Sequence, residues 1–191
     1  DHLITVNEAN NAGRDDAAPG DPDVTASLTE QRVLTENSNA ARDLYNQSSY
    51  GSILDNGQVQ LSLHEALFLL QRNKLRVLND EQNPLEFEDF IQRAKELEND
   101  FWIRYAVYKD MRKRGYIVKT ALKFGADFRV YDRGVQPGDD HAKWIVYPVH
   151  EGDTLTWYEF AAKNRVAHST KKKLMLGVVD VTYWEVQWKR P

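Results

Sequence analysis

A tyrosine and a histidine stand at the two ends of a polar loop in the C-terminal half of the sequence. The stretch FRVYDRGVQPGDDHAKWIV, residues 128–146, contains two strand-like runs; Tyr131 closes the first and His141 opens the second. The Gly and Pro residues between them are typical of a turn between strands. A phenol and an imidazole held side by side could transfer protons, whereas an ordinary surface hairpin is the alternative that spacing alone leaves open.

Three consecutive lysines, Lys171, Lys172 and Lys173, lead directly into the apolar run LMLGVV. Side chains alternate across a strand, so we expect one lysine to be held against the sheet while its neighbours face solvent. A fixed ammonium, an imidazole and a phenol are the groups needed to cleave RNA without a metal ion. One removes the 2′-hydroxyl proton, one protonates the leaving 5′-oxygen, and the cation stabilises the phosphorane. Plain surface charge is the alternative interpretation of the three lysines.

The sequence lacks the residues that several other kinds of catalytic site need. The five histidines are scattered, there is no His-x-x-x-His, and no Asp/Glu/Lys cluster of the restriction-nuclease kind is present. Asp139 and Asp140 beside His141 could bind a cation, but their position in a loop favours simple solvation. Gly-rich phosphate loops and a GxSxG motif are also missing. We therefore expect neither a metal site nor a cofactor.

Composition and charge indicate a globular protein with a phosphate-bearing partner. Residues 101–191 hold 17 Lys and Arg against 10 Asp and Glu, whereas residues 1–100 hold 8 against 19. A basic half of this kind favours nucleic acid as the partner, although charged runs are often just solvated faces. Apolar runs fall short of the roughly 18 residues that a membrane span requires. The chain has no cysteine, which excludes thiolate chemistry and fits a cytoplasmic location.

The N-terminal half predicts short strands and helices behind a linker. SLTEQRVLT alternates like one short strand, NSNAARDLYNQSSYG predicts a capped short helix, and GQVQLS predicts another strand. Ser62 and Glu65 form a capping box, so a helix is expected to begin there, with His64 as a surface residue in its first turn. Residues 1–24 have a linker composition, rich in Gly, Pro, Ala and Asp.

One long amphipathic helix is predicted after the break at Asn83-Pro84. Apolar residues recur at three- and four-residue steps from Phe87 to Met111, and Gly115 suits the position just after the helix. We expect the aromatic stripe of this helix to form core. The rest of the chain predicts strands, interrupted by one short helix in TWYEFAAKN. The pattern favours an acidic α-rich domain followed by a basic mixed α/β domain with a helix packed on its sheet.

Several long motifs resemble those of the tRNA-splicing (tRNA-intron) endonucleases of archaea. RGYIVKTALKFGADFRVYDRG, then His141, then RVAHSTKKKLMLGVVD resemble the C-terminal domain of that family. LYNQSSYG and VQLSLHEALFLLQRNKL resemble its N-terminal domain. The resemblance extends from about Val24 to Arg190.

The resemblance implies a fold class and a domain division. The fold class would be α+β, with a small α-rich N-terminal domain followed by a mixed α/β C-terminal nuclease domain, whose restriction-endonuclease-like sheet carries flanking helices. Residues 1–24 would be a linker or the end of a preceding repeat. Residues 25–84 would form an N-terminal α/β domain, residues 85–114 a long connecting helix, and residues 115–191 the catalytic domain.

The resemblance also implies an activity. Members of the family are metal-independent RNA endonucleases that cut introns from precursor tRNA at bulge-helix-bulge splice sites, leaving 2′,3′-cyclic phosphate and 5′-hydroxyl ends. The family triad falls on Tyr131 as general base, His141 as general acid and Lys172 as the stabilising cation. Arg165 and Trp188 fall where the family pinches a bulge base between two side chains. These residues stack on any base without reading its sequence.

Further assignments depend on the family pattern His-Ser-x-[Arg/Lys]-Lys. It selects Lys172 from its neighbours and makes His168 a structural residue. Ala121 replaces a glycine that is frequent in relatives, a mild change. In GVVDVTYWEV, Asp180 runs straight into Val181, where relatives commonly have an acidic loop that docks on an opposing subunit. We therefore expect the catalytic unit of a two-repeat or heteromeric enzyme, assembled with further copies or with a related structural subunit.

Two other functions remain open from the sequence. A non-catalytic, RNA-binding structural subunit of the same assembly would typically have lost the three catalytic residues, which this chain retains. A metal-dependent DNA nuclease on a similar scaffold would need a carboxylate cluster that the sequence lacks.

Overall fold

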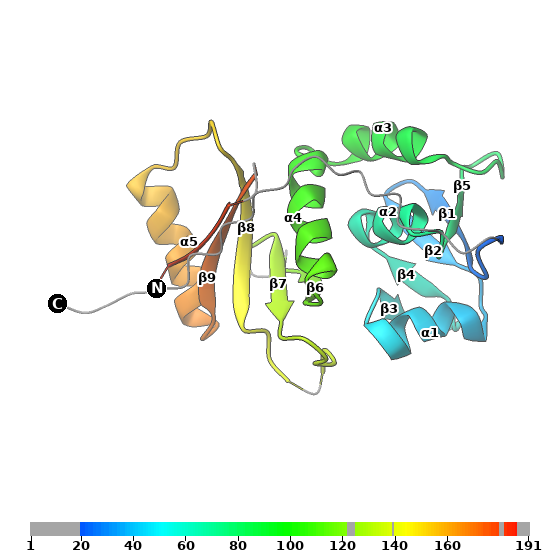
Figure 1. Cartoon of the computed structure of the whole chain (residues 1–191), viewed down its shortest axis with the longest axis horizontal. Helices are drawn as coiled ribbons and strands as arrows, with labels where there is room; N and C mark the ends of the chain where they lie inside the picture. Colours follow the sequence, from blue (N-terminus) through cyan, green and yellow to red (C-terminus); the bar gives the residue numbers. More distant parts are fainter. Residues whose placement is uncertain (1–19, 122–124, 139, 180–181, 187–191) are drawn as a thin grey trace. The chain divides into compact units, whose positions relative to one another are not determined.

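The computed structural model describes residues 20–121, 125–138 and 140–179, and the backbone of residues 182–186. The chain divides between Trp102 and Ile103 into two compact units, each with its own sheet and helices (Figure 1). The structure is thus mixed α/β, as the fold class predicts. In the described part of the chain, no helix is long and apolar enough to cross a membrane.

A five-stranded sheet with the order β3-β4-β2-β1-β5 forms the N-terminal unit. Its strands are β1 (Thr25–Thr29), β2 (Arg32–Thr35), β3 (Ser52–Ile53), β4 (Val59–Leu61) and β5 (Arg76–Leu78). The unit is therefore mixed α/β, with a complete sheet beside its helices. The stretch SLTEQRVLT is a hairpin of β1 and β2, not one strand, because the backbone turns at Glu30, which has a φ of 54°.

The helices of this unit are α1 (Asn39–Ser48), α2 (Leu63–Gln71) and α3 (Phe87–Leu97). The first two begin where their capping residues predict. The Ser62 hydroxyl accepts from the backbone N–H of Glu65, and the Glu65 carboxylate accepts from the backbone N–H of Ser62. The predicted capping box is confirmed, and Ser38 likewise caps α1.

His64 is a buried residue, so its prediction as a surface residue was wrong. It is only 4% exposed, and its ring stacks on Phe101 with 4.9 Å between centroids. Its Nε2 lies 3.6 Å from a carboxylate oxygen of Glu98. The reason is that all seven residues of Leu63–Leu69 are buried, so the first turn of α2 has no solvent-facing side.

The predicted long helix is two helices. The first, α3, stops at Leu97; Glu98 is extended, Asp100 has a φ of 58°, and the second helix, α4 (Phe101–Lys113), begins directly afterwards. Asn and Asp favour local turns over helix interiors, and both tolerate left-handed backbone, so the segment Glu98–Asp100 interrupts an otherwise continuous apolar pattern. Gly115 follows α4 with a φ of 92°, as predicted.

The aromatic stripe across these two helices is mostly core. Phe90, Phe101, Tyr105 and Tyr108 are at most 1% exposed, which confirms the prediction for them. Trp102 departs from it, with 46% of its surface exposed.

A second five-stranded sheet, with the order β10-β9-β8-β7-β6, forms the C-terminal unit. Its elements are β6 (Ile117–Thr120), β7 (Phe128–Tyr131), β8 (Trp144–His150), α5 (Trp157–Ser169), β9 (Lys173–Val179) and β10 (Thr182–Val186). The pairs β6–β7, β7–β8 and β9–β10 are antiparallel, and β8–β9 is parallel. The crossover between the two parallel strands contains α5.

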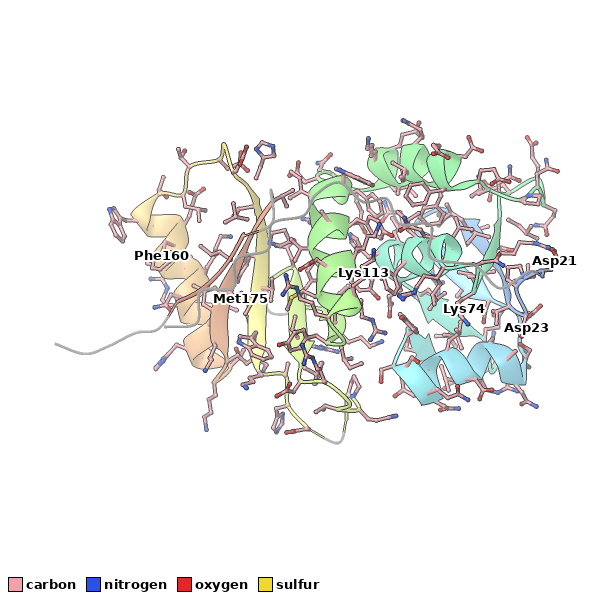
Figure 2. The ribbon with its side chains drawn as sticks, in the orientation of Figure 1. Asp21, Asp23, Lys74, Lys113, Phe160 and Met175 are labelled. Carbon is pink, nitrogen blue, oxygen red and sulfur yellow. The ribbon has the colours of Figure 1, made fainter. Side chains whose placement is uncertain are left out.

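Helices cover both faces of this sheet (Figure 1). On one face, Ala167 of α5 packs with Ile145 and Leu174, and Phe160 of α5 lies against the same cluster (Figure 2). On the other face, Tyr108 of α4 contacts the Phe128 ring, with 6.1 Å between centroids. The sheet is the middle layer, and its edges are where polar side chains can reach solvent.

Candidate active site

The ends of three inner strands of the C-terminal sheet lie side by side, and the predicted catalytic residues lie there. We call this end of the sheet the edge. Because β7 runs antiparallel to β8, and β8 runs parallel to β9, the end of β7 and the starts of β8 and β9 share this edge. Tyr131 is the last residue of β7. His141 precedes β8 by three residues, and Lys172 immediately precedes β9. Residues distant in sequence are therefore brought to one end of the sheet.

Backbone hydrogen bonds continue the strand register to this edge. The N–H of Lys143 donates to the carbonyl of Val130 at 2.8 Å, and the N–H of Lys173 donates to the carbonyl of Lys143 at 3.0 Å. Extending the register by one residue places Tyr131, Lys143 and Lys172 in one row. With a strand spacing of about 4.8 Å, the Cα atoms of Tyr131 and Lys172 are roughly 10 Å apart.

Alternation assigns the backbone positions of this row to the face that α5 covers, whereas the Lys143 ammonium turns back to the neighbouring Trp144 ring. Lys143 is two residues before Ile145, and Lys172 is two residues before Leu174; both apolar residues belong to the cluster under α5. The row lies at the C-terminal end of that helix, where its last turn leads into β9. The site is thus at the sheet edge beside the end of α5.

Tyr131 is fixed by packing. Its side chain is 6% exposed and forms a small cluster with Ile117 and Ala142, against which Val135 also packs. Ala142 is the residue next to His141, so the returning limb of the loop is packed against the tyrosine. This contact ties the position of the histidine backbone to the phenol ring.

His141 is exposed, but its backbone is held. Its N–H donates to the Oδ1 of Asp140 at 2.7 Å, and the following residue, Ala142, is buried. The imidazole is therefore open to solvent and to a substrate. The hydrogen bond gives Asp140 a local role in the loop, and Asp139 lies outside the described residues.

Lys172 differs from the lysines on either side of it. Its side chain is half-buried, whereas Lys171 and Lys173 are exposed, which is the arrangement that strand alternation predicts for one lysine of the three. The Nζ of Lys172 donates to the carbonyl of Thr170 at 3.1 Å, and its backbone N–H donates to the carbonyl of Ala167 at 2.8 Å. The ammonium is thereby held at the end of α5.

The other predicted residues lie as follows. Arg165 is exposed on α5, four residues before the last residue of that helix. His168, interpreted as structural, is also exposed, in the last turn. Trp188 lies outside the described residues. Lys143, in contrast, was not predicted, because only the register across β8 reveals that it stands between Tyr131 and Lys172.

Two residues of this unit with perturbed pKa values, Tyr147 and Glu159, lie beside or on α5 rather than in the row. Burial raises the pKa of Tyr147, and the charge of Asp127 adds to the effect. Hydrogen bonds from the backbone and hydroxyl of Thr156 lower the pKa of Glu159, which closes the N-terminal capping box of α5. The first reflects the burial of Tyr147 in the cluster under α5, and the second reflects the N-terminal cap of that helix.

Chemically, the edge offers a phenol, an imidazole and an ammonium, from Tyr131, His141 and Lys172. In the described ranges, no group of three or more His, Asp or Glu side chains could hold a metal ion. The arrangement therefore suits proton transfer combined with electrostatic stabilisation of an anionic transition state.

Two family models match most of the chain. The model described as tRNA intron endonuclease, N-terminal domain, matches residues 24–91, and the model described as tRNA intron endonuclease, catalytic C-terminal domain, matches residues 101–188. The candidate edge falls within the second match.

Curated relatives extend the similarity over most of the chain. A tRNA-splicing endonuclease of Nanoarchaeum equitans is 48% identical over 140 residues, which are 69% of this chain and 90% of that protein. One of Thermococcus onnurineus is 40% identical over 84% of this chain and 94% of the relative. One of Methanothermobacter thermautotrophicus is 38% identical over 88% of this chain and 99% of the relative.

Proposed function

The chain belongs to the tRNA intron endonuclease family, and on that premise we propose that it cuts precursor tRNA without a metal ion. The cuts fall at bulge-helix-bulge splice sites and leave 2′,3′-cyclic phosphate and 5′-hydroxyl ends. The names of the relatives and the two matched domains support an endonuclease that removes tRNA introns. The observation that carries the finer proposal is the shared sheet edge of Tyr131, His141 and Lys172.

In the proposed reaction, the phenolate of Tyr131 takes the proton of the ribose 2′-hydroxyl. The 2′-oxygen then bonds to phosphorus, and the bond from phosphorus to the 5′-oxygen breaks. The imidazolium of His141 gives its proton to that leaving oxygen. The ammonium of Lys172 stabilises the negative charge of the phosphorane, which a half-buried cation does better than a fully solvated one.

Binding of the substrate involves residues outside the row. We propose that Arg165 and Trp188 pinch a bulge base, in keeping with the exposed position of Arg165 beside the site. The enzyme acts in the cytoplasm as an assembly with further copies or with a related structural subunit or repeat. Its C-terminal domain would be of the restriction-endonuclease-like type.

A bulge-helix-bulge RNA incubated in excess EDTA tests the proposal. We expect cleavage by the wild-type protein, loss of cleavage in His141→Ala, and a loss of about 10²-fold or more in Lys172→Ala. Lys173→Ala is the matched control, because it removes the neighbouring exposed ammonium while keeping the backbone bond to Lys143. Cleavage that needs Mg²⁺ would contradict the proposal. RNA binding without any cleavage would favour the alternative, a non-catalytic structural subunit.

A further inference from the structure

Two cationic and two aromatic side chains form a chain of contacts next to the His141 loop. The Arg133 guanidinium lies 5.0 Å from the centroid of the Tyr116 ring. The Tyr116 ring meets the Trp144 ring edge-on, with 5.6 Å between centroids and 85° between planes. The Nζ of Lys143 lies 4.7 Å from the Trp144 centroid. We call these four residues the aromatic clamp.

The clamp joins the two ends of the loop that carries His141. Residues 132–143 connect β7 to β8; Arg133 is the second residue of this loop and Lys143 is the last. An ion pair between Lys143 and Asp132, with 3.7 Å between Nζ and Oδ2, links the same two ends. A loop of this length loses considerable conformational entropy when it adopts one conformation, so contacts at its ends are needed to hold it.

The aromatic half of the clamp is anchored in the fold. Trp144 is the first residue of β8 and is only 8% exposed, and Tyr116 is half-buried immediately before β6. The cations remain near solvent: Arg133 is exposed, and the Lys143 side chain is 49% exposed. Rigid rings thus restrain two flexible, exposed side chains on either side of the histidine.

We propose that Tyr116 and Trp144 are positioning residues, which act through Arg133 and Lys143 to hold His141 where it can protonate the leaving oxygen. This inference rests on the proposed function, because it assumes that His141 is the general acid. The contacts that define the clamp do not involve the Tyr131 side chain. Its loss should therefore impair proton donation and leave the attack of the 2′-oxygen largely intact.

A pair of substrates separates proton donation from the other steps. One is a bulge-helix-bulge RNA with the normal 5′-oxygen leaving group, and the other carries sulfur at that position, which leaves without being protonated. Single-turnover rates at saturating enzyme are measured for each in excess EDTA. Tyr116→Leu removes the ring from the clamp, whereas Tyr116→Phe retains a ring for both Arg133 and Trp144.

We expect Tyr116→Leu to slow the oxygen substrate about 10- to 100-fold, as a misplaced catalytic group does, and to slow the sulfur substrate less than about threefold. Tyr116→Phe should stay within about threefold of wild type on both. Arg133→Gln should reproduce the substrate-dependent loss, and it tests the clamp at an exposed residue if Tyr116→Leu fails to fold. Equal losses on the two substrates, or no loss in either variant, would overturn the inference.

His141→Ala distinguishes this failure from failure of the proposed function. If His141 is the acid, this variant fails to cleave the oxygen substrate but cleaves the sulfur substrate at most of the wild-type rate. If His141→Ala is equally slow with both substrates, the proposed role of the histidine is wrong, and the positioning role is wrong with it. If His141→Ala regains its cleavage rate on the sulfur substrate and the clamp variants cleave both substrates like wild type, only the positioning role is wrong.

Discussion

Replacing Tyr131 by phenylalanine separates its proposed chemistry from its packing. The side chain is 6% exposed, and its contacts with Ile117, Ala142 and Val135 are made in an apolar cluster that a phenyl ring also fills. We therefore expect the free energy of unfolding of Tyr131→Phe to change by less than about 1 kcal/mol. The loss of a general base should slow cleavage about 10²- to 10⁴-fold. At about 1.4 kcal/mol per factor of ten, that is roughly 3–6 kcal/mol of transition-state stabilisation.

The assay is single-turnover cleavage of a bulge-helix-bulge RNA in EDTA, with urea unfolding of the same samples. Tyr147→Phe is the matched control, because Tyr147 is a buried tyrosine of the same sheet that lies outside the row. It should cleave at a rate close to wild type. A Tyr131→Phe enzyme that cuts within about threefold of wild type would refute the base role. A parallel loss of rate and of stability would indicate that the tyrosine acts through packing.

Three further predictions concern stability. His64→Ala removes a buried ring that stacks on Phe101, so urea unfolding should show a loss of about 2–4 kcal/mol; a loss below about 0.5 kcal/mol would mean that the site behaves as surface. Asp100→Ala should lower the free energy of unfolding by about 1 kcal/mol, because residue 100 has a positive φ between α3 and α4. Asp100→Gly should be tolerated, and equal effects of the two substitutions would contradict this explanation of the break. Because the pKa of Glu159 is lowered in the fold, its ionised carboxylate stabilises the fold at pH values above the usual carboxyl pKa of 4.5. This contribution is lost as the pH falls through the folded pKa. The difference in Tm between wild type and Glu159→Gln should therefore shrink on acidification from pH 7 toward pH 3, and a constant difference would rule out the capping carboxylate as its source.

Local signals in the sequence were sufficient where neighbouring residues determine the structure. The capping box of Ser62 and Glu65, and the end of α4 before Gly115, follow from contacts within a few residues. The strand that ends at Tyr131 and the strand that follows Lys172 were also predictable, because each is a distinct apolar run. The residue types favoured Tyr131, His141 and one of the three lysines, and the resemblance to a family selected Lys172.

The remaining features depend on contacts between distant segments. His64 was misassigned because its burial is produced by Phe101, thirty-seven residues later in the sequence. The break between α3 and α4 was missed because the apolar period continues across Glu98–Asp100. Lys143 and the aromatic clamp become visible only when the pairing of β7 with β8, and of β8 with β9, brings separate segments to one edge.

The chemical form of the cleaved end tests the central claim most directly. Precursor tRNA is cut in excess EDTA, and the 3′ end of the released 5′ exon is identified by mass spectrometry. Attack by the neighbouring 2′-oxygen, with His141 as acid, predicts a 2′,3′-cyclic phosphate opposite a 5′-hydroxyl, formed by wild type and not by His141→Ala. A 3′-hydroxyl opposite a 5′-phosphate, or cleavage that appears only when Mg²⁺ is restored, would contradict it.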